Sequence, residues 1–462
     1  MSTGDPKVHI ETYGCQMNQL DSEVLAGILC DEGFQLAERE EDADVILINT
    51  CAVREHAEER VLGRISSLHR LQFQRPDLVL GVVGCMAQRL GLKLRERCPY
   101  VSLIAGPDAY RSLPALIAES RSKGCATCLR LDASEQYEGI RAHRKHGLKA
   151  WISIMRGCNN LCAYCIVPYV RGGERSRPHA SILAEVQDLA GQGFREITLL
   201  GQNVNSYQDG QIGFSDLLRR IDEETDIGRV RFVTSHPKDL SEDILRAMAD
   251  ASSVCEHLHL PLQSGSNRVL EAMNRGYSAE QYLCLVERAR QLIAGLSITT
   301  DVIAGFPGET EADFQATLDL IETVEFDDAF TYRYSPREGT SASQMPDTVA
   351  PKEKHARLCR LISTQRSISQ GKNAKLVGTA QEVMVEGKAR RSERQLLART
   401  RTNKPVVIGN GAEHVRIGDM VKATIIDSTS ATLIGEIQRC VLAVQDAAGT
   451  GNQGGCPNAR SV

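Results

Sequence analysis

Three cysteines with the spacing Cys-x3-Cys-x2-Cys constrain this 462-residue chain more than any other feature. Cys158, Cys162 and Cys165 come directly after the apolar run 151–155, which predicts a strand that delivers all three thiols to one short loop. Thiolates suit iron–sulfur clusters, and a [4Fe–4S] cluster takes four protein ligands. Three cysteines therefore leave one iron open to a small molecule. A zinc site fits poorly, because zinc usually takes four ligands and often two Cys-x-x-Cys pairs.

The residues around the triplet resemble the signature of radical S-adenosylmethionine (SAM) enzymes, with Tyr164 just before the last cysteine. The matching flanks argue against three unrelated buried cysteines. The resemblance implies that the open iron chelates SAM through its amino and carboxylate groups. It also implies that an electron from the cluster cleaves SAM to a 5′-deoxyadenosyl radical, so the three cysteines count as catalytic residues.

Residues 1–145 alternate apolar runs with helical patterns, as in an open parallel α/β sheet. We expect strands and helices at residues 8–13, 18–30, 45–48, 53–71, 78–83, 86–95 and 101–105. Cys15, Cys51 and Cys85 each follow one of these strands and lie near the start of the next helix. Ligands bind beyond the carboxyl ends of such strands, and helix N-termini favour thiolate. A second three-thiolate cluster is predicted, although small buried cysteines are also common at strand ends.

The segments 13–18, 49–55 and 84–88 resemble the N-terminal domain of the methylthiotransferases. In that family the matching cysteines bind an auxiliary [4Fe–4S] cluster that carries the sulfur to be inserted. The resemblance therefore implies this role for Cys15, Cys51 and Cys85, which also count as catalytic residues. Cys125 and Cys128 have no second pair nearby, so we interpret their surroundings as a connector.

Repeated strand–helix units from about residue 147 to 340 match the partial (β/α)6 barrel of radical SAM enzymes, in which function lies at the carboxyl ends of the strands. We expect strands at 150–155, 196–200, 231–234, 258–260, 298–303 and 330–334, and helices at 182–190, 241–249, 279–292 and 311–324. Each polar residue at such an end is more often a cap or a turn than a ligand. As a set that matches family blocks, the candidates for SAM binding are Tyr164, Gly172, Gly173, Glu174, Asn203, Gln263, Asp301 and Phe306, with Arg337 as a substrate contact.

Beyond a helical bridge at 341–371, short alternating runs at 382–386, 396–400, 405–408, 420–426 and 431–437 predict a small β-barrel. Residues 372–440 contain 12 Lys and Arg against 7 Asp and Glu, which suits a polyanion. The module resembles a TRAM domain, an RNA-binding unit of tRNA-modifying enzymes. The resemblance implies phosphate contacts by Arg399, Arg401 and Lys404, with a solvated surface turn as the alternative.

Composition points to a soluble protein, with 24% charged residues and a mean hydropathy of -0.25. No apolar run approaches the roughly 20 residues of a membrane helix, and the first residues carry no apolar signal segment. We therefore expect a cytoplasmic protein without a membrane partner. In a reducing compartment, fifteen cysteines favour metal or catalytic thiols over disulfides.

The expected fold class is α/β, divided into an N-terminal sheet domain (1–145), a radical SAM core with its bridge (146–371), a TRAM-like barrel (372–440) and a disordered tail (441–462). Over about residues 7–440 the chain is identified as a member of the radical SAM methylthiotransferases. It most resembles the transferases that convert N6-(dimethylallyl)adenosine beside the tRNA anticodon to its 2-methylthio derivative.

The resemblance implies two [4Fe–4S] clusters and SAM as cofactors, and the tRNA anticodon loop as substrate. It further implies an external electron donor, sulfur and cluster donors, and a monomer. The alternatives are the sister enzymes that act on threonylcarbamoyladenosine in tRNA or on a ribosomal-protein aspartate. An alternative from another class is a non-catalytic iron–sulfur regulator that binds RNA.

Overall fold

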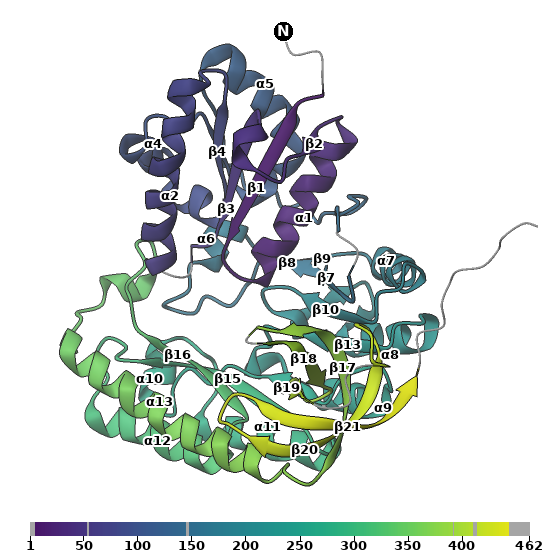
Figure 1. The fold of residues 1–462 in the computed structure, drawn as a ribbon. Coiled ribbons are helices and arrows are strands. Elements are labelled where there is room, and N and C mark those ends of the chain that lie inside the picture. The colour runs from purple at the N-terminus through teal and green to yellow at the C-terminus, as the bar shows by residue number, and fades with distance from the viewer. Residues whose placement is uncertain (1–4, 53–54, 145–146, 391, 410–413, 443–462) are drawn as a thin grey trace, which may run out of the picture. The chain divides into compact units, whose positions relative to one another are not determined.

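The computed structural model describes residues 5–52, 55–144, 147–390, 392–409 and 414–442 (Figure 1). By its internal contacts the chain divides into two units. The larger unit contains Met1–Lys372 and Arg401–Asn403, and the smaller contains Asn373–Thr400 and the residues from Lys404 onward. The α/β class predicted from the sequence is confirmed. The predicted tail, beyond residue 442, lies outside the described residues.

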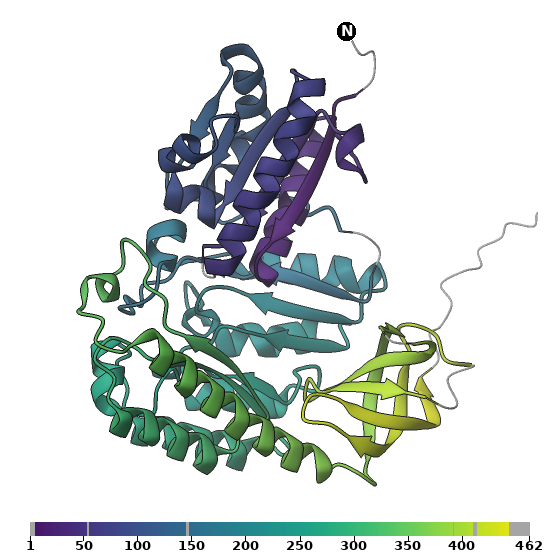
Figure 2. The ribbon, with the colours of Figure 1, turned by 60° about the vertical axis from the view of Figure 1, so that its left-hand side comes forward.

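A six-stranded parallel sheet forms the N-terminal part of the larger unit, in the order β2-β1-β3-β4-β5-β6. Its strands are β1 (Lys7–Tyr13), β2 (Gln35–Leu36), β3 (Val45–Thr50), β4 (Val79–Gly84), β5 (Leu103–Ala105) and β6 (Ala126–Cys128). Both faces are covered, one by α1 (Gln16–Asp31) and α5 (Leu113–Lys123), the other by α2 (Glu55–Gln74), α3 (Cys85–Leu90) and α4 (Leu92–Arg97) (Figure 2). This explains why β3 and β4 are buried along their whole length rather than at alternate residues.

Two details of this sheet differ from the sequence-based expectation. The connector predicted around Cys125 and Cys128 contains β6, which pairs with β5 at the edge of the sheet. A three-residue strand is too short to show an alternating pattern. The helix predicted at 86–95 is divided at Gly91, whose φ of +52° lies in the left-handed region and ends α3.

Six parallel strands of the central part form two sheets, β13-β10-β7 and β14-β15-β16. They are β7 (Lys149–Ser153), β10 (Glu196–Leu200), β13 (Arg229–Phe232), β14 (His257–His259), β15 (Ser297–Ala304) and β16 (Asp328–Arg333). The helices between them are α7 (His179–Gly191), α8 (Phe214–Glu224), α9 (Glu242–Asp250), α10 (Asn267–Ala272), α11 (Ala279–Leu292) and α12 (Glu311–Val324). The predicted strand–helix repeat is thus confirmed.

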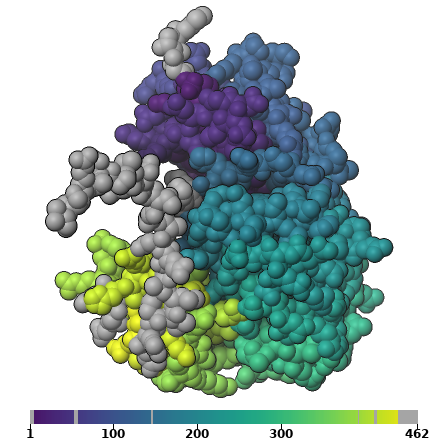
Figure 3. All heavy atoms as spheres, turned by 90° about the vertical axis from the view of Figure 1, so that its right-hand side faces the viewer, coloured from purple at the N-terminus to yellow at the C-terminus, as the bar shows by residue number. Residues whose placement is uncertain are grey.

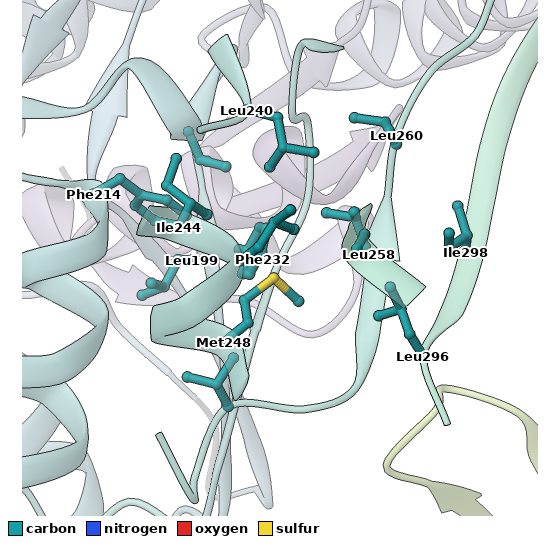
Figure 4. Close-up of a cluster of buried hydrophobic side chains, with 14 of the residues drawn as sticks. Leu199, Phe214, Phe232, Leu240, Ile244, Met248, Leu258, Leu260, Leu296 and Ile298 are labelled. Carbon is teal, nitrogen blue, oxygen red and sulfur yellow. The ribbon is translucent and has the colours of Figure 1, made fainter. Parts of the chain in front are cut away.

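The largest core lies between these strands and their helices. Leu199, Phe232, Leu258 and Ile298 come from four successive strands and pack with helix residues such as Met248 (Figure 4). Side chains alternate along a strand, so neighbouring residues point to the opposite, inner side of the barrel. On that inner side, Trp151 and Leu200 pack against the core of the N-terminal sheet. Figure 3 shows the surface of the larger unit, from purple and blue in its N-terminal part to teal and green in its central part.

The bridge predicted at 341–371 contains a short turn (Ser341–Gln344) and the long helix α13 (Pro351–Ala374). The smaller unit is a closed barrel in the order β17-β18-β19-β21-β20, as predicted. Its strands are β17 (Ala380–Ala389), β18 (Ser392–Thr400), β19 (Pro405–Ile408), β20 (Met420–Ser428) and β21 (Leu433–Leu442). Among the described residues, no helix has the length and apolar character needed to cross a membrane.

Candidate functional site

The cysteine triplet lies on one loop between β8 (Met155–Arg156) and α6 (Val167–Arg171). Gly157 opens this loop with a φ of +76°, and a Cβ there would lie 1.9 Å from the backbone oxygen of Gly173. The Cys158 N–H donates to the backbone oxygen of Gly172 at 3.1 Å. The glycine segment predicted to bind SAM therefore lies directly against the loop that presents the three thiols.

The thiols of this loop are well shielded from water. Cys158 and Cys162 are each 8% exposed, and burial raises the pKa of Cys158 to about 11 and that of Cys165 to about 12. A buried thiolate needs a positive charge nearby, which a bound metal supplies. Arg275, itself buried, already donates Nη1–H to the Cys162 sulfur at 3.2 Å. The site is therefore chemically suited to an iron–sulfur cluster.

The second cysteine set lies at the carboxyl edge of the N-terminal sheet. The register pairs Tyr13 with Thr50 and Thr50 with Gly84, so Cys51 and Cys85 follow directly opposed residues of β3 and β4. Cys15 follows β1 and caps α1. The three residues thus meet at one edge because their strands are neighbours in a parallel sheet.

Electrostatics differ among these three thiols. A hydrogen bond with the Cys51 thiol, together with the positive charge of Arg171, lowers the pKa of Cys15 to about 6. Burial raises the pKa of Cys85, although Arg171 counteracts this. Two thiols in mutual contact beside a guanidinium form a donor set that fits iron or another soft metal. The ligand role of each cysteine stays a prediction.

Glu174 and Asn203 are placed beside the barrel loop. The Glu174 carboxylate accepts the Asn159 N–H at 3.2 Å, and the Glu174 N–H donates to the Asn159 side chain at 3.1 Å. The Asn203 amide donates to Asp239 at 2.8 Å. Glu174 therefore presents a carboxylate beside the loop of the three thiols, and its contact with SAM stays a prediction.

Several buried polar atoms at the carboxyl ends of the barrel strands have no hydrogen-bond partner within the described residues. They are Asn203 Oδ1, Ser235 Oγ, His236 Nε2, Gln263 Oε1 and the Tyr334 hydroxyl. Buried polar groups are nearly always paired, so these atoms offer hydrogen-bonding positions for a polar ligand. The arrangement fits SAM, which brings an amino acid, a ribose and a base.

His236 adds a neutral donor to this group. Burial lowers its pKa to about 3, helped by the charges of Arg275 and Lys238. Its Nδ1 accepts the Lys238 N–H at 3.2 Å, so Nε2 carries the proton. His236 is not among the residues predicted from the sequence, because a single histidine carries no spacing signal.

The other predicted SAM contacts are placed less directly. The Asp301 carboxylate lies 3.5 Å from His259 Nε2, and the Tyr164 hydroxyl lies 3.3 Å from Arg275. Phe306 is fully buried and packs against Tyr334, with ring centroids 5.3 Å apart. Its side chain therefore stabilises the loop after β15 through packing. A ligand contact at Phe306 would have to come from its backbone.

The basic residues predicted to contact substrate already have partners. Arg337 donates to Ser335 at 3.3 Å, Arg399 pairs with Glu386 at 2.6 Å, and Lys404 donates to Asn373 at 2.9 Å. Arg401, which groups with the larger unit, pairs with Glu256 at 2.8 Å. Phosphate binding by these side chains stays a prediction and would require exchange of these contacts.

Three family descriptions match successive parts of the chain. Residues 7–106 match the uncharacterized protein family UPF0004, residues 152–321 the radical SAM superfamily, and residues 374–437 the TRAM domain. Among solved structures, the radical SAM methyltransferase TsrM from Kitasatospora setae has 18% sequence identity and a TM-score of 0.55. It covers 73% of this chain and 77% of its own, and shows the shared fold.

Curated relatives match nearly the whole chain. The tRNA-2-methylthio-N(6)-dimethylallyladenosine synthase of Thermoanaerobacter sp. (strain X514) is 48% identical over 93% of this chain and 92% of its own length. The protein of the same name from Chloroherpeton thalassium is 47% identical, over 93% and 95%. At this identity and coverage, the chain belongs to the family of tRNA-2-methylthio-N(6)-dimethylallyladenosine synthases.

Proposed function

We propose that this protein is a radical SAM methylthiotransferase that converts N6-(dimethylallyl)adenosine next to the tRNA anticodon to its 2-methylthio derivative. One observation carries the proposal: a single chain presents two separate sets of three cysteines, one on the barrel loop and one at the sheet edge. A synthase that must both generate a radical and deliver sulfur needs two such centres. The names and coverage of the curated relatives support the substrate.

The reaction replaces C–H at carbon 2 of the adenine with C–S–CH3. That carbon has no leaving group and no acidic proton, so a radical route is required. When bound, SAM and the two [4Fe–4S] clusters supply the radical, the methyl group and the sulfur.

The chain's own residues bind and orient these groups. Cys158, Cys162 and Cys165 hold three irons of the barrel cluster, and Cys15, Cys51 and Cys85 hold three of the auxiliary cluster. Glu174 offers its carboxylate to the ammonium of SAM beside the barrel loop. The unpaired Asn203 and Gln263 oxygens and the His236 Nε2–H provide further polar contacts, and their burial excludes water.

Function divides among the parts proposed from the sequence. Residues 1–145 hold the auxiliary cluster, 146–371 bind SAM and the adenosine, and 372–440 bind tRNA. The match of residues 374–437 to the TRAM domain supports the last assignment. Arg399, Arg401 and Lys404 then exchange their present partners for phosphates, and Arg337 contacts the substrate.

The remaining partners follow from the chemistry. The reaction consumes electrons and sulfur, so we propose an external electron donor together with sulfur and cluster donors. Both cysteine sets come from one chain, which supports a monomer. The tRNA substrate supports action in the cytoplasm.

The proposal is tested by nucleoside mass spectrometry of tRNA from cells that lack this protein. We expect unthiolated N6-(dimethylallyl)adenosine to accumulate and the 2-methylthio form to return with the unaltered gene. Neither triple Ala variant of a cysteine set should restore it, whereas Cys98→Ala, a buried cysteine outside both sets, should. Reconstituted protein should contain about eight irons per chain, and about four in each triple variant. Unchanged tRNA in the deletion strain would refute the assignment.

A further inference from the structure

A buried arginine connects the two cysteine sets. Arg171 is the last residue of α6, the helix that follows the barrel loop, and is 3% exposed. Its Nε–H donates to the sulfur of Cys85 at 3.1 Å, so a residue of the barrel segment contacts a thiol of the other set. The proposed function assigns no role to Arg171, so the burial of its positive charge needs a separate explanation.

The guanidinium is held in a fixed direction. Its Nη1 and Nη2 groups both donate to the fully buried carboxylate of Asp21, with the Nη1 contact at 3.5 Å. Asp21 also accepts the Tyr137 hydroxyl at 3.0 Å. The carboxylate of Asp21 thus holds one edge of the planar guanidinium, while the Nε–H group points at the sulfur of Cys85. A lysine side chain cannot reproduce this geometry.

The barrel set has a corresponding arrangement. Arg275 is 4% exposed and donates Nη1–H to the sulfur of Cys162 at 3.2 Å. Its Nε–H donates to the Tyr277 hydroxyl at 3.1 Å. Each set of three thiols is therefore paired with one buried arginine that donates to a single sulfur.

We propose that Arg171 is a positioning residue for the auxiliary cluster. Arg171 sets the reduction potential of that cluster through the hydrogen bond to Cys85, and it fixes the cluster relative to the barrel loop. Hydrogen bonds to the ligand sulfurs and local charge are the main protein controls on such potentials. A guanidinium beside Cys85 stabilises the more negative, reduced cluster and so raises its potential. The inference rests on the auxiliary cluster of the proposed function.

The test is a potentiometric titration followed by electron paramagnetic resonance, which needs no tRNA and no turnover. The parent carries Cys158→Ala, Cys162→Ala and Cys165→Ala, so that only the auxiliary cluster remains. Arg171→Gln combined with Asp21→Asn replaces the whole ion pair, so the net charge is unchanged, no buried carboxylate is left unpaired, and the arginine's hydrogen bond to the Cys85 sulfur is lost. We expect a more negative midpoint potential than in the parent. Arg171→Lys, a second variant, should shift the potential in the same direction because the ammonium cannot span both partners.

The matched control is Arg357→Gln combined with Glu309→Gln. This pair is equally buried, with Arg357 Nη1 at 2.8 Å from Glu309, and the described hydrogen bonds of Arg357 are to oxygen atoms. Its midpoint potential should equal that of the parent. A parent-like potential in both Arg171 variants, or an equal shift in the control, would overturn the role of Arg171. Iron near zero in the parent would overturn the auxiliary cluster itself, so the two failures are distinguishable.

Discussion

Asp108 is the residue whose replacement should most weaken the junction between the N-terminal sheet and the barrel. Its side chain is fully buried and lies 2.7 Å from Arg156 and 2.9 Å from Arg175, whose side chains are 1% and 6% exposed. It also accepts the Asp132 N–H at 2.9 Å. Asp108→Asn keeps the volume but leaves two buried guanidinium groups without their carboxylate.

The expected loss of folding stability follows from the burial of Asp108 and its two arginine partners. Removing one partner of a buried ion pair destabilises a protein by about 3–5 kcal/mol, against a total of about 5–15 kcal/mol for an ordinary domain. With a urea slope of about 1–3 kcal/mol per M, the midpoint of unfolding should fall by at least about 1 M. The exposed pair Lys93–Glu338, 2.7 Å apart and 60% and 72% exposed, gives the contrast. Glu338→Gln should cost about 0–1 kcal/mol.

The assay is urea unfolding followed by fluorescence of Trp151, the single tryptophan of the chain. Trp151 lies on β7 and packs against the core of the N-terminal sheet, so its emission reports on this junction. Midpoints are compared, because a chain of several domains need not unfold in one step. Equal shifts for Asp108→Asn and Glu338→Gln would refute the argument from burial.

Two further predictions concern RNA binding and pH. Removal of residues 375–462 should weaken tRNA binding and reduce the slope of log affinity against log salt by about 0.9 for each lost phosphate contact; equal slopes in a salt series would place RNA binding elsewhere. Burial raises the pKa of Glu23 from 4.5 to about 7 despite its ion pair with Arg144. The folded protein therefore keeps this proton longer than the unfolded chain, and stability falls as pH rises through that window. Relative to Glu23→Gln, the unaltered protein should lose stability between pH of about 4.5 and 7 in urea unfolding, and a constant difference would contradict the raised pKa.

Much of the fold was predictable because strong local patterns specify it. Apolar runs in the sequence predict the six barrel strands, and the spacing of the three cysteines predicts the loop that presents them. The meeting of Cys15, Cys51 and Cys85 was also predictable, since a parallel sheet brings the carboxyl ends of neighbouring strands to one edge. In each case the information lies within a few residues or in a general rule of topology.

The features that sequence reasoning missed depend on long-range pairing. Arg171 lay in a segment that was selected for its glycines, yet its partners Asp21 and Cys85 are 150 and 86 residues away. Arg275 likewise contacts Cys162 across 113 residues. The resemblance to a TRAM domain also implies a phosphate contact by Arg399, whereas the structure pairs Arg399 with Glu386 on the adjacent strand. No local pattern distinguishes an arginine that meets a carboxylate from one that meets a phosphate.

The buried charges at the junction between sheet and barrel are better explained by position than by stability. Arg156, Arg171 and Arg175 meet Asp21 and Asp108 there, next to an apolar contact made by Trp151 and Leu200. Apolar side chains of similar volume often give equal or greater stability than buried ion pairs. Contacts between apolar side chains are not directional, however, whereas the guanidinium of Arg171 holds both a carboxylate and a sulfur at defined angles. The proposed reaction joins sulfur carried at the auxiliary cluster to an adenosine activated at the barrel cluster, and it therefore requires the two cysteine sets at a constant separation. The arginines supply that constraint at the point where the two parts of the chain meet.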